Sequence, residues 1–292
     1  LLHIQDKSSQ LCAAALGAKP GERVLDCCAA PGSKSFTAAE WMGDEGEIIS
    51  CDIFAEKIKK IEQGAKRLGL SCIRARLQDA TAFDPSLGQF DRVLCDAPCS
   101  GIGIIGRKPE IKYKKEQDLQ DLPQVQAKIL DNVSRYVKKG GTLLYSTCTL
   151  LERENGAVVQ AFLKEHPEFE PAALPEMVQK ACGIADKQAW KVTLLPHKGQ
   201  RAQTDGFFIA TIKKVRGLSV EQQSLEGKID IKSLELEELT GQLAQMGQPK
   251  FRGGQVYSWL HEKRVDSFDQ MSNLPAALRQ SLFRLACLQM ED

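Results

Sequence analysis

The stretch ERVLDCCAAPGSKS, residues 22–35, runs from an apolar, strand-like segment through a loop of small residues into a helical pattern. At such a strand-to-helix turn, backbone N–H groups can meet an anion. The loop is not a dinucleotide fingerprint, because GxGxxG is absent. It is not a phosphate-binding P-loop either, because Ser33 separates Gly32 from Lys34 and the earlier glycine is missing. A small-residue loop suits a cofactor whose charge is a carboxylate, and a tight turn without function is the alternative.

Residues 21–148 alternate between short apolar runs and helical patterns. After the first run, the strand-like segments are GEIISCDI (46–53), CIRARLQD (72–79), FDRVLCDAP (90–98) and KGGTLLYSTC (139–148). Helices are predicted over 55–69 and 125–140, the second with Val137 on its apolar face and Gly140 as its stop. This alternation predicts a parallel sheet covered by helices on both faces. Two later strands, at 191–198 and 205–215, are expected to form an antiparallel edge pair.

Polar and thiol side chains follow these strands at their carboxyl ends, where ligands bind in open parallel sheets. Asp52 ends the second strand, Asp79 follows the third, Cys99 lies past the fourth and Cys148 ends the fifth. Asp52 can accept hydrogen bonds from two ribose hydroxyls, or cap the helix that starts near Ala55. Asp79 can accept from an adenine amino group, or cap a turn. The sequence therefore predicts one site along this edge.

Composition narrows the class of protein. The 292 residues carry a net charge of +1 and are 42% hydrophobic, as in an ordinary globular protein. No apolar run approaches the roughly 18 residues that a membrane span needs. The ten cysteines form no paired CxxC set, so we expect no metal site. Without a secretory signal, we expect reduced thiols in a cytoplasmic protein.

The pattern changes after residue 215. Residues 1–215 form the predicted α/β domain, and the polar, aperiodic segment 216–228 is predicted to be a linker. Residues 229–292 are predicted to form a small all-helical domain, with Ser233 capping its first helix. Further helices are expected at 251–263 and 275–288.

Six ordered motifs resemble the RsmB/Sun-type RNA (cytosine-5) methyltransferases over about residues 3–215. They are LDCCAAPGSKS (25–35), CDI (51–53), LQDA (77–80), FDRVLCDAPCSGIGIIGRKPEIK (90–112), GGTLLYSTCTLLERENGAVV (140–159) and DGFFIA (205–210). The resemblance implies a Rossmann-like class I methyltransferase sheet and S-adenosylmethionine as cofactor. It also implies methyl transfer to a cytosine in RNA, in the first place 16S rRNA, with tRNA or another rRNA as the alternative. Ser33 replaces the glycine usual in the family, which a backbone with negative φ tolerates.

The resemblance also implies roles for individual residues. Asp52 would bind the cofactor's ribose, Asp79 its adenine, and Asp96 would lie on the active-site side and hold the N3/N4 edge of cytosine. Cys148 of the STC motif would be the nucleophile, and Cys99 of the DAPC motif would assist its release. The methionine end of the cofactor would lie along Cys28, Ala29, Ala30, Pro31, Gly32, Ser33 and Lys34.

These roles suit the chemistry, because C5 of cytosine is too weak a nucleophile to take a methyl group directly. A thiolate that adds to C6 makes C5 enamine-like, and loss of the C5 proton later expels the thiolate. A cysteine with a pKa of about 8.5 is only a few per cent thiolate at neutral pH. The cationic cofactor and Lys34 are expected to lower that pKa. For either thiol, the alternative is a packed core cysteine.

The expected RNA must be single-stranded or have its base flipped, so that both faces of the cytosine are reached. A basic loop after DAPC can hold its phosphates, with a solvated charge run as the alternative; it comprises Arg107, Lys108, Lys112, Lys114 and Lys115. One rival function is a thiol hydrolase that pairs Cys148 with His197, but it leaves the small-residue loop and Asp52 unexplained. The other rival is a non-catalytic RNA-binding module, against which Cys148, Cys99 and Asp96 argue.

Residues 229–285 carry a second resemblance, to the small N-terminal helical domain of RlmN, a radical-S-adenosylmethionine adenine-C2 methyltransferase. The iron–sulfur motif CxxxCxxC of that family is absent, and Cys287 is the one cysteine after residue 215. We therefore expect no radical chemistry from this part of the chain.

Overall fold

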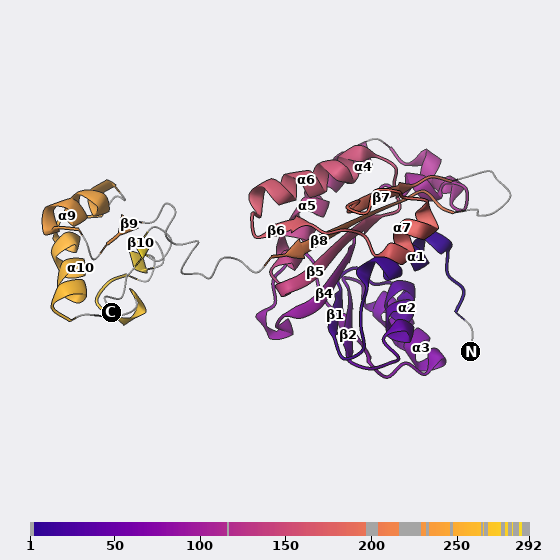
Figure 1. The fold of residues 1–292 in the computed structure, drawn as a ribbon, viewed down its shortest axis with the longest axis horizontal. Coiled ribbons are helices and arrows are strands. Elements are labelled where there is room, and N and C mark those ends of the chain that lie inside the picture. The colour runs from indigo at the N-terminus through magenta and orange to yellow at the C-terminus, as the bar shows by residue number, and fades with distance from the viewer. Residues whose placement is uncertain are drawn as a thin grey trace. The chain divides into compact units, whose positions relative to one another are not determined.

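A computed structural model describes the chain in two compact units, residues 1–216 and 217–292 (Figure 1). The described residues are 3–115, 117–196, 204–215, 229–231, 234–245, 248–263, 265, 268–275, 278–279, 282 and 286–287. The predicted linker 216–228, the predicted cap Ser233 and His197 lie outside them. The domain boundaries drawn from the sequence stay a prediction.

The first unit is built on an eight-stranded sheet in the order β3-β2-β1-β4-β5-β8-β6, with β7 also paired to β8. The strands are β1 Arg23–Asp26, β2 Glu47–Asp52, β3 Ile73–Leu77, β4 Phe90–Asp96, β5 Val137–Thr147, β6 Phe169–Pro171, β7 Lys191–Leu194 and β8 Phe207–Lys214. The first five strands run parallel, which confirms the expected sheet. Strand β8 is antiparallel to β5 and carries β6 and β7 on its other side. The predicted antiparallel pair is thus β7 with β8, although β8 lies inside the sheet rather than at its edge.

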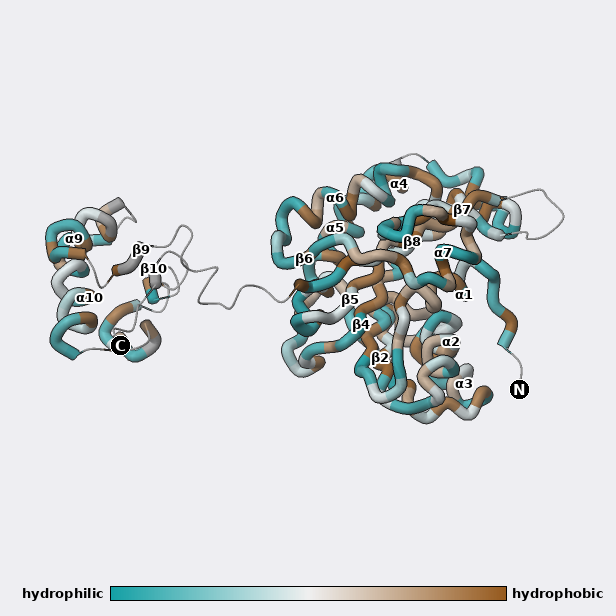
Figure 2. The backbone as a smooth tube through the Cα atoms, in the orientation of Figure 1, coloured by the Kyte–Doolittle hydropathy of each residue, from teal (hydrophilic) through white to brown (hydrophobic). Residues whose placement is uncertain are grey.

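Helices cover both faces of this sheet, as Figure 1 shows. They are α1 Lys7–Leu16, α2 Ser33–Trp41, α3 Ala55–Leu68, α4 Gln117–Gln120, α5 Leu122–Ser134, α6 Gly156–Glu165 and α7 Glu176–Cys182. Successive strand residues point to opposite faces, so neighbours such as Val24 and Leu25 enter different cores. Leu25 belongs to the core that includes residues of α5 and α6, and Val24 to the core that includes residues of α1, α2 and α7. Figure 2 shows the resulting concentration of hydrophobic residues in the central strands.

The predicted helix 125–140 is wrong at its end. Helix α5 stops at Ser134, and Val137 begins strand β5, where it pairs with Phe90 and is fully buried. Gly140 does not stop a helix but has a φ of +78°, within an irregularity of the β4–β5 register. The helical spacing of Val133 and Val137 was misleading because pairing with β4 overrides local periodicity.

The second unit contains helices α9 Leu236–Gln245 and α10 Phe251–His261 and a 3-10 turn at Phe268–Gln270. Leu239, Leu243, Val256 and Leu260 belong to its apolar core. The expectation of helices alone is corrected by a short parallel pair, β9 Ile229–Asp230 with β10 Ala286–Cys287. The predicted last helix therefore does not extend over 286–287, because their backbone groups pair with β9 instead.

Candidate active site

An open pocket of about 380 Å³ lies at the carboxyl ends of the parallel strands. Its lining comprises Cys27, Cys28, Ala30, Asp52, Ile53, Phe54, Lys57, Gln78, Asp79, Ala80, Thr81, Asp96, Ala97, Pro98, Cys99, Val125, Ile129 and Cys148. The predicted site residues follow the strand order β3-β2-β1-β4-β5, from Asp79 and Asp52 through Cys28 to Asp96 and Cys148. The pocket thus runs across five neighbouring strands, and its volume suits a small-molecule cofactor.

Residues of the small-residue loop line two separate hollows. Cys28 and Ala30 line the pocket, whereas Pro31 and Ser33 line a separate open hollow beside His3 and Phe36. Gly32 has a φ of +103°, and a Cβ built there would lie 2.5 Å from the Phe36 Cζ, so only glycine fits. Ser33 is the first residue of α2 and has helical backbone geometry, so its replacement of the family glycine costs no strain.

The two thiols predicted to act together are in contact. The Sγ atoms of Cys99 and Cys148 lie 3.1 Å apart, and both side chains are partly buried at the pocket wall. The hydrogen bond from Cys99 lowers the pKa of Cys148; burial and Asp96 oppose this effect, and Lys34 supports it. The same bond, together with burial, raises the pKa of Cys99 well above its ordinary value. The two thiols are therefore close enough to share one hydrogen bond, in which one sulfur stabilises the other as thiolate.

The loop that carries Cys99 is clamped at the next residue, Ser100, which is fully buried. The Ser100 N–H donates to the Glu154 carboxylate at 2.8 Å, and the Ser100 and Thr149 hydroxyls lie 2.7 Å apart. Glu154 also accepts a hydrogen bond from the Gln126 amide at 3.0 Å. Because Thr149 directly follows Cys148, this network ties the two cysteine loops to each other.

Backbone hydrogen bonds also join the loop after β4 to Cys148 and to the residues before β8. The Gly103 N–H donates to the carbonyl of Cys148 at 3.0 Å, and the Gly206 N–H donates to the carbonyl of Gly103 at 2.8 Å. A Cβ on Gly103 would lie 2.1 Å from the Gly206 carbonyl oxygen. The segments around residues 103 and 206 can approach the Cys148 carbonyl only because Gly103 has no side chain.

Asp96 lies in a buried ionic network next to the thiols. Its Oδ2 is 2.5 Å from the Lys34 Nζ, and its Oδ1 accepts a hydrogen bond from the Ser146 hydroxyl at 2.7 Å. Burial opposes the charge of Lys34, but Asp96 and the neighbouring acidic groups outweigh it and raise the Lys34 pKa. Behind it, burial raises the pKa of Asp26 to about 7. Lys34 therefore stays cationic and holds the Asp96 carboxylate beside the pocket.

Asp52 lies at the start of helix α3 and also lines the pocket. Its carboxylate is almost fully buried, accepts the Phe54 N–H at 3.2 Å and lies 3.4 Å from the Lys57 Nζ. The residue therefore supports the start of α3 although the N-cap position itself is Phe54. It also lines the pocket, where the remaining lone pairs of its carboxylate can accept further hydrogen bonds.

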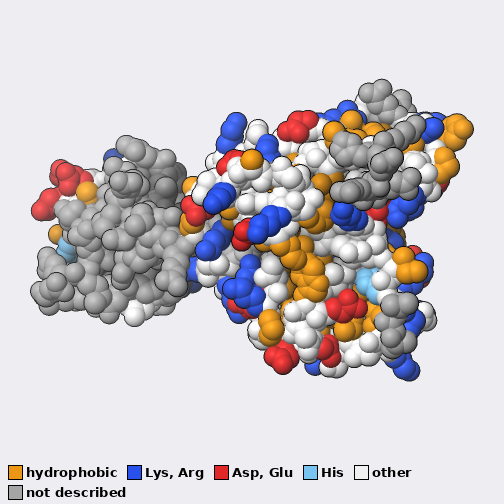
Figure 3. Space-filling model, turned by 45° about the vertical axis from the view of Figure 1, so that its right-hand side comes forward, with side chains coloured by type: hydrophobic (Ala, Val, Ile, Leu, Met, Phe, Trp, Pro, Cys, Tyr) orange, Lys and Arg blue, Asp and Glu red, His pale blue; other side chains and the backbone are white. Residues whose placement is uncertain are grey.

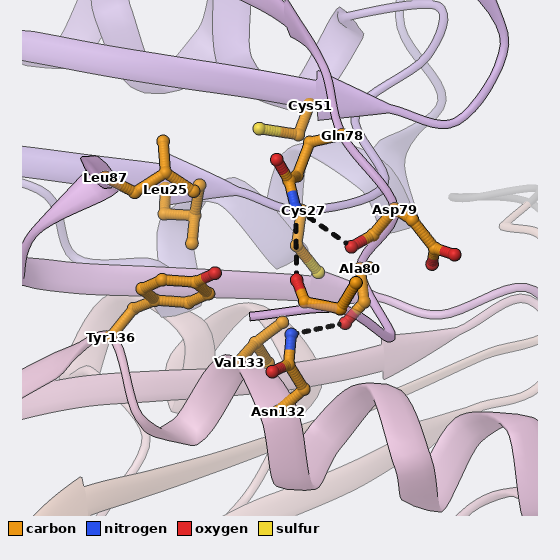
Figure 4. A pocket seen from close by; sticks show the side chains of 11 residues that line it. Leu25, Cys27, Cys51, Gln78, Asp79, Ala80, Leu87, Asn132, Val133 and Tyr136 are labelled. Atoms are coloured by element: carbon orange, nitrogen blue, oxygen red, sulfur yellow. Dashed lines mark hydrogen bonds between the residues drawn. The ribbon is translucent and has the colours of Figure 1, made fainter. Parts of the chain in front are cut away.

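Asp79 likewise caps a turn and faces the pocket. Its Oδ1 accepts both the N–H and the hydroxyl of Thr81 at 2.8 Å, and these hydrogen bonds lower its pKa. In Figure 4 its carboxylate points away from the apolar cluster of Leu25, Leu87 and Tyr136. The Asn132 amide donates to the Ala80 carbonyl at 2.8 Å and fixes the turn.

Other pocket residues were missed in the sequence. Phe54 is 50% exposed and lies under the Lys57 ammonium, 4.5 Å from the ring centroid. Val125, on the apolar stripe of the predicted helix, is 39% exposed and lines the pocket with Ile129. An apolar side chain in the first turn of a helix that follows a motif loop was the available signal for Val125. For Phe54 the available signal was an apolar pair, Ile53-Phe54, directly after Asp52.

Within the described ranges, no group of three or more His, Cys, Asp or Glu side chains is arranged to hold a metal ion. In the same part of the chain, no helix is both long and apolar enough to cross a membrane. His197, the proposed partner of Cys148 in a thiol hydrolase, lies outside the described residues.

Residues 13–213 match the family described as 16S rRNA methyltransferase RsmB/F. The chain belongs to this family. It is 47% identical over 219 residues to the probable ribosomal RNA small subunit methyltransferase B of Bacillus subtilis, and this match covers 72% of the chain and 47% of that relative. A Synechocystis protein of the same description is 36% identical, again over 72% of the chain and 47% of the relative. The chain thus spans about half the length of the curated relatives it matches.

Solved structures agree with this assignment. NSun6 from Pyrococcus horikoshii, solved with SFG, has a TM-score of 0.62 at 27% identity, covering 73% of this chain and 53% of that one. A methyltransferase homologue from the same organism has a TM-score of 0.58 at 29% identity, covering 73% and 68%. These findings confirm the expected Rossmann-like methyltransferase fold and S-adenosylmethionine as the cofactor of the family. The pocket fits such a molecule because its lining combines the buried carboxylate of Asp52 with the small side chains of Cys28 and Ala30.

Residues 229–288 match a second family, described as the ribosomal RNA large subunit methyltransferase N-terminal domain. This match confirms the resemblance of the second unit to the RlmN N-terminal domain.

Proposed function

We propose that the chain methylates C5 of a cytosine in ribosomal RNA, with 16S rRNA as the substrate, through a covalent bond between Cys148 and C6. The observation that carries the proposal is the contact between the Cys99 and Cys148 thiols, 3.1 Å apart, at the wall of the pocket beside Asp96. Cys12, in contrast, is completely buried and does not line this pocket, and burial raises its pKa to about 12.

The two thiols account for the bond that forms and breaks at C6. The Cys148 thiolate adds to C6, and the displaced π electrons make C5 nucleophilic toward the methyl group that the bound cofactor supplies as a sulfonium. Loss of the C5 proton to a base then returns an electron pair to the ring and expels Cys148 as thiolate. The Cys99 S–H donates to that sulfur, so the hydrogen bond favours ionisation before attack and stabilises the leaving group afterwards.

Asp96 is assigned to hold the cytosine ring in place. Its carboxylate is oriented by Lys34 and Ser146, and its remaining lone pairs can accept from the cytosine 4-amino group and from a protonated N3. A cytosine ring held by its N3/N4 edge turns its opposite edge, with C6 and C5, toward the thiols, so that Cys148 can add to C6. This geometry requires a single-stranded or flipped nucleotide.

The cofactor assignments follow the strand order. Asp79 on the β3 side is assigned to adenine, Asp52 after β2 to ribose, and the turn from Cys28 to Lys34 after β1 to the methionine end. The reacting methyl group then lies toward β4 and β5, where Asp96, Cys99 and Cys148 are. A cofactor bound in the opposite direction would place its sulfonium away from both thiols.

Labelled S-adenosylmethionine and rRNA provide the test. We expect Cys148→Ala to abolish methyl transfer while it keeps cofactor affinity, because the lost bond exists only during reaction. Cys99→Ala should methylate but stall release, so that an RNA–protein adduct accumulates as a slower band on a denaturing gel. The double mutant should give no adduct.

Two outcomes would contradict these roles. Adduct from Cys148→Ala instead of Cys99→Ala would make Cys99 the nucleophile. Methylation intact in both single mutants, with no adduct anywhere, would make both cysteines core thiols. Mass mapping of the labelled RNA decides between a small-subunit rRNA position and tRNA or another rRNA.

A further inference from the structure

An exposed aromatic ring stands within the basic segment that follows the Cys99 loop. Residues 107–115, RKPEIKYKK, contain five cationic side chains and one carboxylate, and Tyr113 among them is 85% exposed. Cations by themselves do not locate a nucleic-acid path here, because Lys and Arg side chains are spread over the visible face of the first unit among acidic ones (Figure 3). An exposed ring between cations is, however, the combination with which proteins hold single-stranded nucleic acid.

The segment is anchored to the active site from its inner side. Ile111 is buried over Gly101, where an added Cβ would lie 3.1 Å from the Ile111 Cδ1. The Lys114 ammonium donates to the carbonyl of Ser100 at 3.0 Å. These contacts, on either side of Tyr113, fix its 3-10 helix, Pro109–Tyr113, to the residues directly after Cys99. The ring is therefore held in a defined relation to the thiols rather than carried on a free loop.

The cations of the segment divide into two groups. Arg107 is paired with Asp205, and Lys114 is engaged with Ser100. Lys112 and Lys115 are exposed and form no ion pair within the described part of the chain, as is also true of Lys108. Two cationic side chains that can bind phosphates thus lie close to Tyr113 in the chain. Within residues 107–115, the exposed Glu110 is the one acidic side chain.

We propose that Tyr113 is a stacking platform for the base of a nucleotide that flanks the target cytosine, with Lys112 and Lys115 on adjacent phosphates. The inference rests on the proposed function, since it takes the target base to lie at Cys148. The occupant is single-stranded RNA, because an unpaired base offers a free face to an aromatic ring, whereas a base in a duplex is covered by its neighbours. Every base has such a face, so the ring sets the register of the strand without reading its sequence.

Binding of the 292-residue chain to a fluorescently labelled, cytosine-containing single-stranded RNA tests the inference. Tyr113→Ala should weaken binding by about 5- to 150-fold, the range expected for loss of one base–aromatic stack. Tyr113→Phe keeps the ring and should stay near the wild-type affinity. Neither change should alter the salt dependence, whereas Lys112→Ala should reduce the slope of log K against log salt by about 0.7, the value for one single-strand phosphate contact.

An abasic scan of the same RNA locates the stacked nucleotide. At one flanking position, removal of the base should weaken binding to the wild type and leave binding to Tyr113→Ala unchanged. The inference is overturned if the wild-type chain does not bind the RNA, or if Tyr113→Ala binds it as tightly as the wild type. It is also overturned if Tyr113→Phe loses as much affinity as Tyr113→Ala. A third contradicting result is that no abasic position weakens binding to the wild type while leaving binding to Tyr113→Ala unchanged.

The assay needs no methyl transfer, so it separates the inference from the proposed function. Methylation of the same RNA by the wild-type chain is measured in parallel. Cytosine methylation with an unaffected Tyr113→Ala overturns only the stacking platform. A stacking signature without cytosine methylation overturns the proposed reaction and keeps the RNA contact.

Discussion

The reactivity of Cys148 depends on one neighbouring side chain. Its thiol is partly buried, which by itself would disfavour the thiolate, and the hydrogen bond from Cys99 outweighs that cost and lowers its pKa. Cys12 also has a hydrogen-bond partner, the Ser146 hydroxyl, but its complete burial outweighs that contact and raises its pKa to about 12. Burial likewise raises the pKa of Cys51 to about 12. The balance between burial and hydrogen bonding therefore sets the pKa of each cysteine.

Alkylation of Cys148 as a function of pH tests this dependence. Because its pKa is lowered, the thiolate persists to lower pH than in an ordinary cysteine, and the rate should fall only as pH drops below that pKa. Cys99→Ala removes the donor and should move the midpoint upward, whereas Cys99→Ser keeps a hydroxyl donor and should move it less. Peptide mass spectrometry of iodoacetamide-treated protein follows Cys148 alone. Equal midpoints in all three proteins would remove Cys99 as the cause.

Asp52 is expected to carry cofactor affinity. Asp52→Ala should weaken S-adenosylmethionine binding by roughly 2 kcal/mol, about thirtyfold, because charge-assisted hydrogen bonds to ribose are lost. Calorimetry measures the change. Lys57→Ala is the matched control, since it breaks the ion pair with Asp52 but leaves the carboxylate in the pocket. Equal losses in the two variants would show that the support of helix α3, and not contact with the cofactor, is the role of Asp52.

At the scale of elements, the site depends on how the loops after β4 and β5 are joined. Both loops leave the sheet at neighbouring parallel strands, so their thiols start close together. Glu154, in the turn before α6, then accepts from the Ser100 N–H and from Gln126 of α5. One buried carboxylate thereby fixes the β4 loop to helix α5 and to the turn before α6.

Glu154→Ala is predicted to loosen this join. It leaves the Ser100 N–H buried without its acceptor and the Gln126 side-chain amide with the Pro98 carbonyl as its remaining acceptor, which should destabilise the protein by about 1–3 kcal/mol. Glu154→Gln keeps an acceptor oxygen and should lose much less. Urea unfolding measures stability, and adduct accumulation in labelled reactions reports whether Cys99 still assists release. A Gln variant as unstable as the Ala variant would mean that the negative charge of Glu154, and not its acceptor, holds the loop.

At the scale of the whole molecule, the first unit contains a complete sheet, both apolar cores and every lining residue of the pocket. The second unit has an apolar core of its own, which includes Leu239, Val256 and Met271. Units with separate cores are expected to fold separately.

Deletion of residues 217–292 should therefore leave the first unit folded and able to bind S-adenosylmethionine. A thermal melt and calorimetry of the truncated protein check this. The matched control is a deletion that starts at residue 205, which removes strand β8 from between β5, β6 and β7 and should abolish the transition. Loss of the transition in the shorter deletion would show that the second unit is part of the folding core.

The sequence was enough to predict the five parallel strands, the family and the positions of the site residues along the chain, but not the place of β8 within the sheet. Alternating patterns gave the parallel strands, and the motifs after each strand placed Asp52, Asp79, Asp96, Cys99 and Cys148 at one edge, because parallel strands present their carboxyl ends together. It did not determine the end of helix α5, since the spacing of Val133 and Val137 is equally helical whether or not β4 offers a partner.

Folding was needed to show that the thiols of Cys99 and Cys148 are in contact and what holds their loops together. The pKa of Cys148 depends on a thiol 49 residues away in the chain, and the Ser100–Glu154 clamp joins residues 54 apart. The structure likewise showed that Tyr113 is exposed while Ile111 is buried and the Lys114 ammonium reaches the Ser100 carbonyl. A sequence pattern records which side chains are present, whereas a pKa shift or a docking surface depends on distances and burial that exist only after the chain has folded.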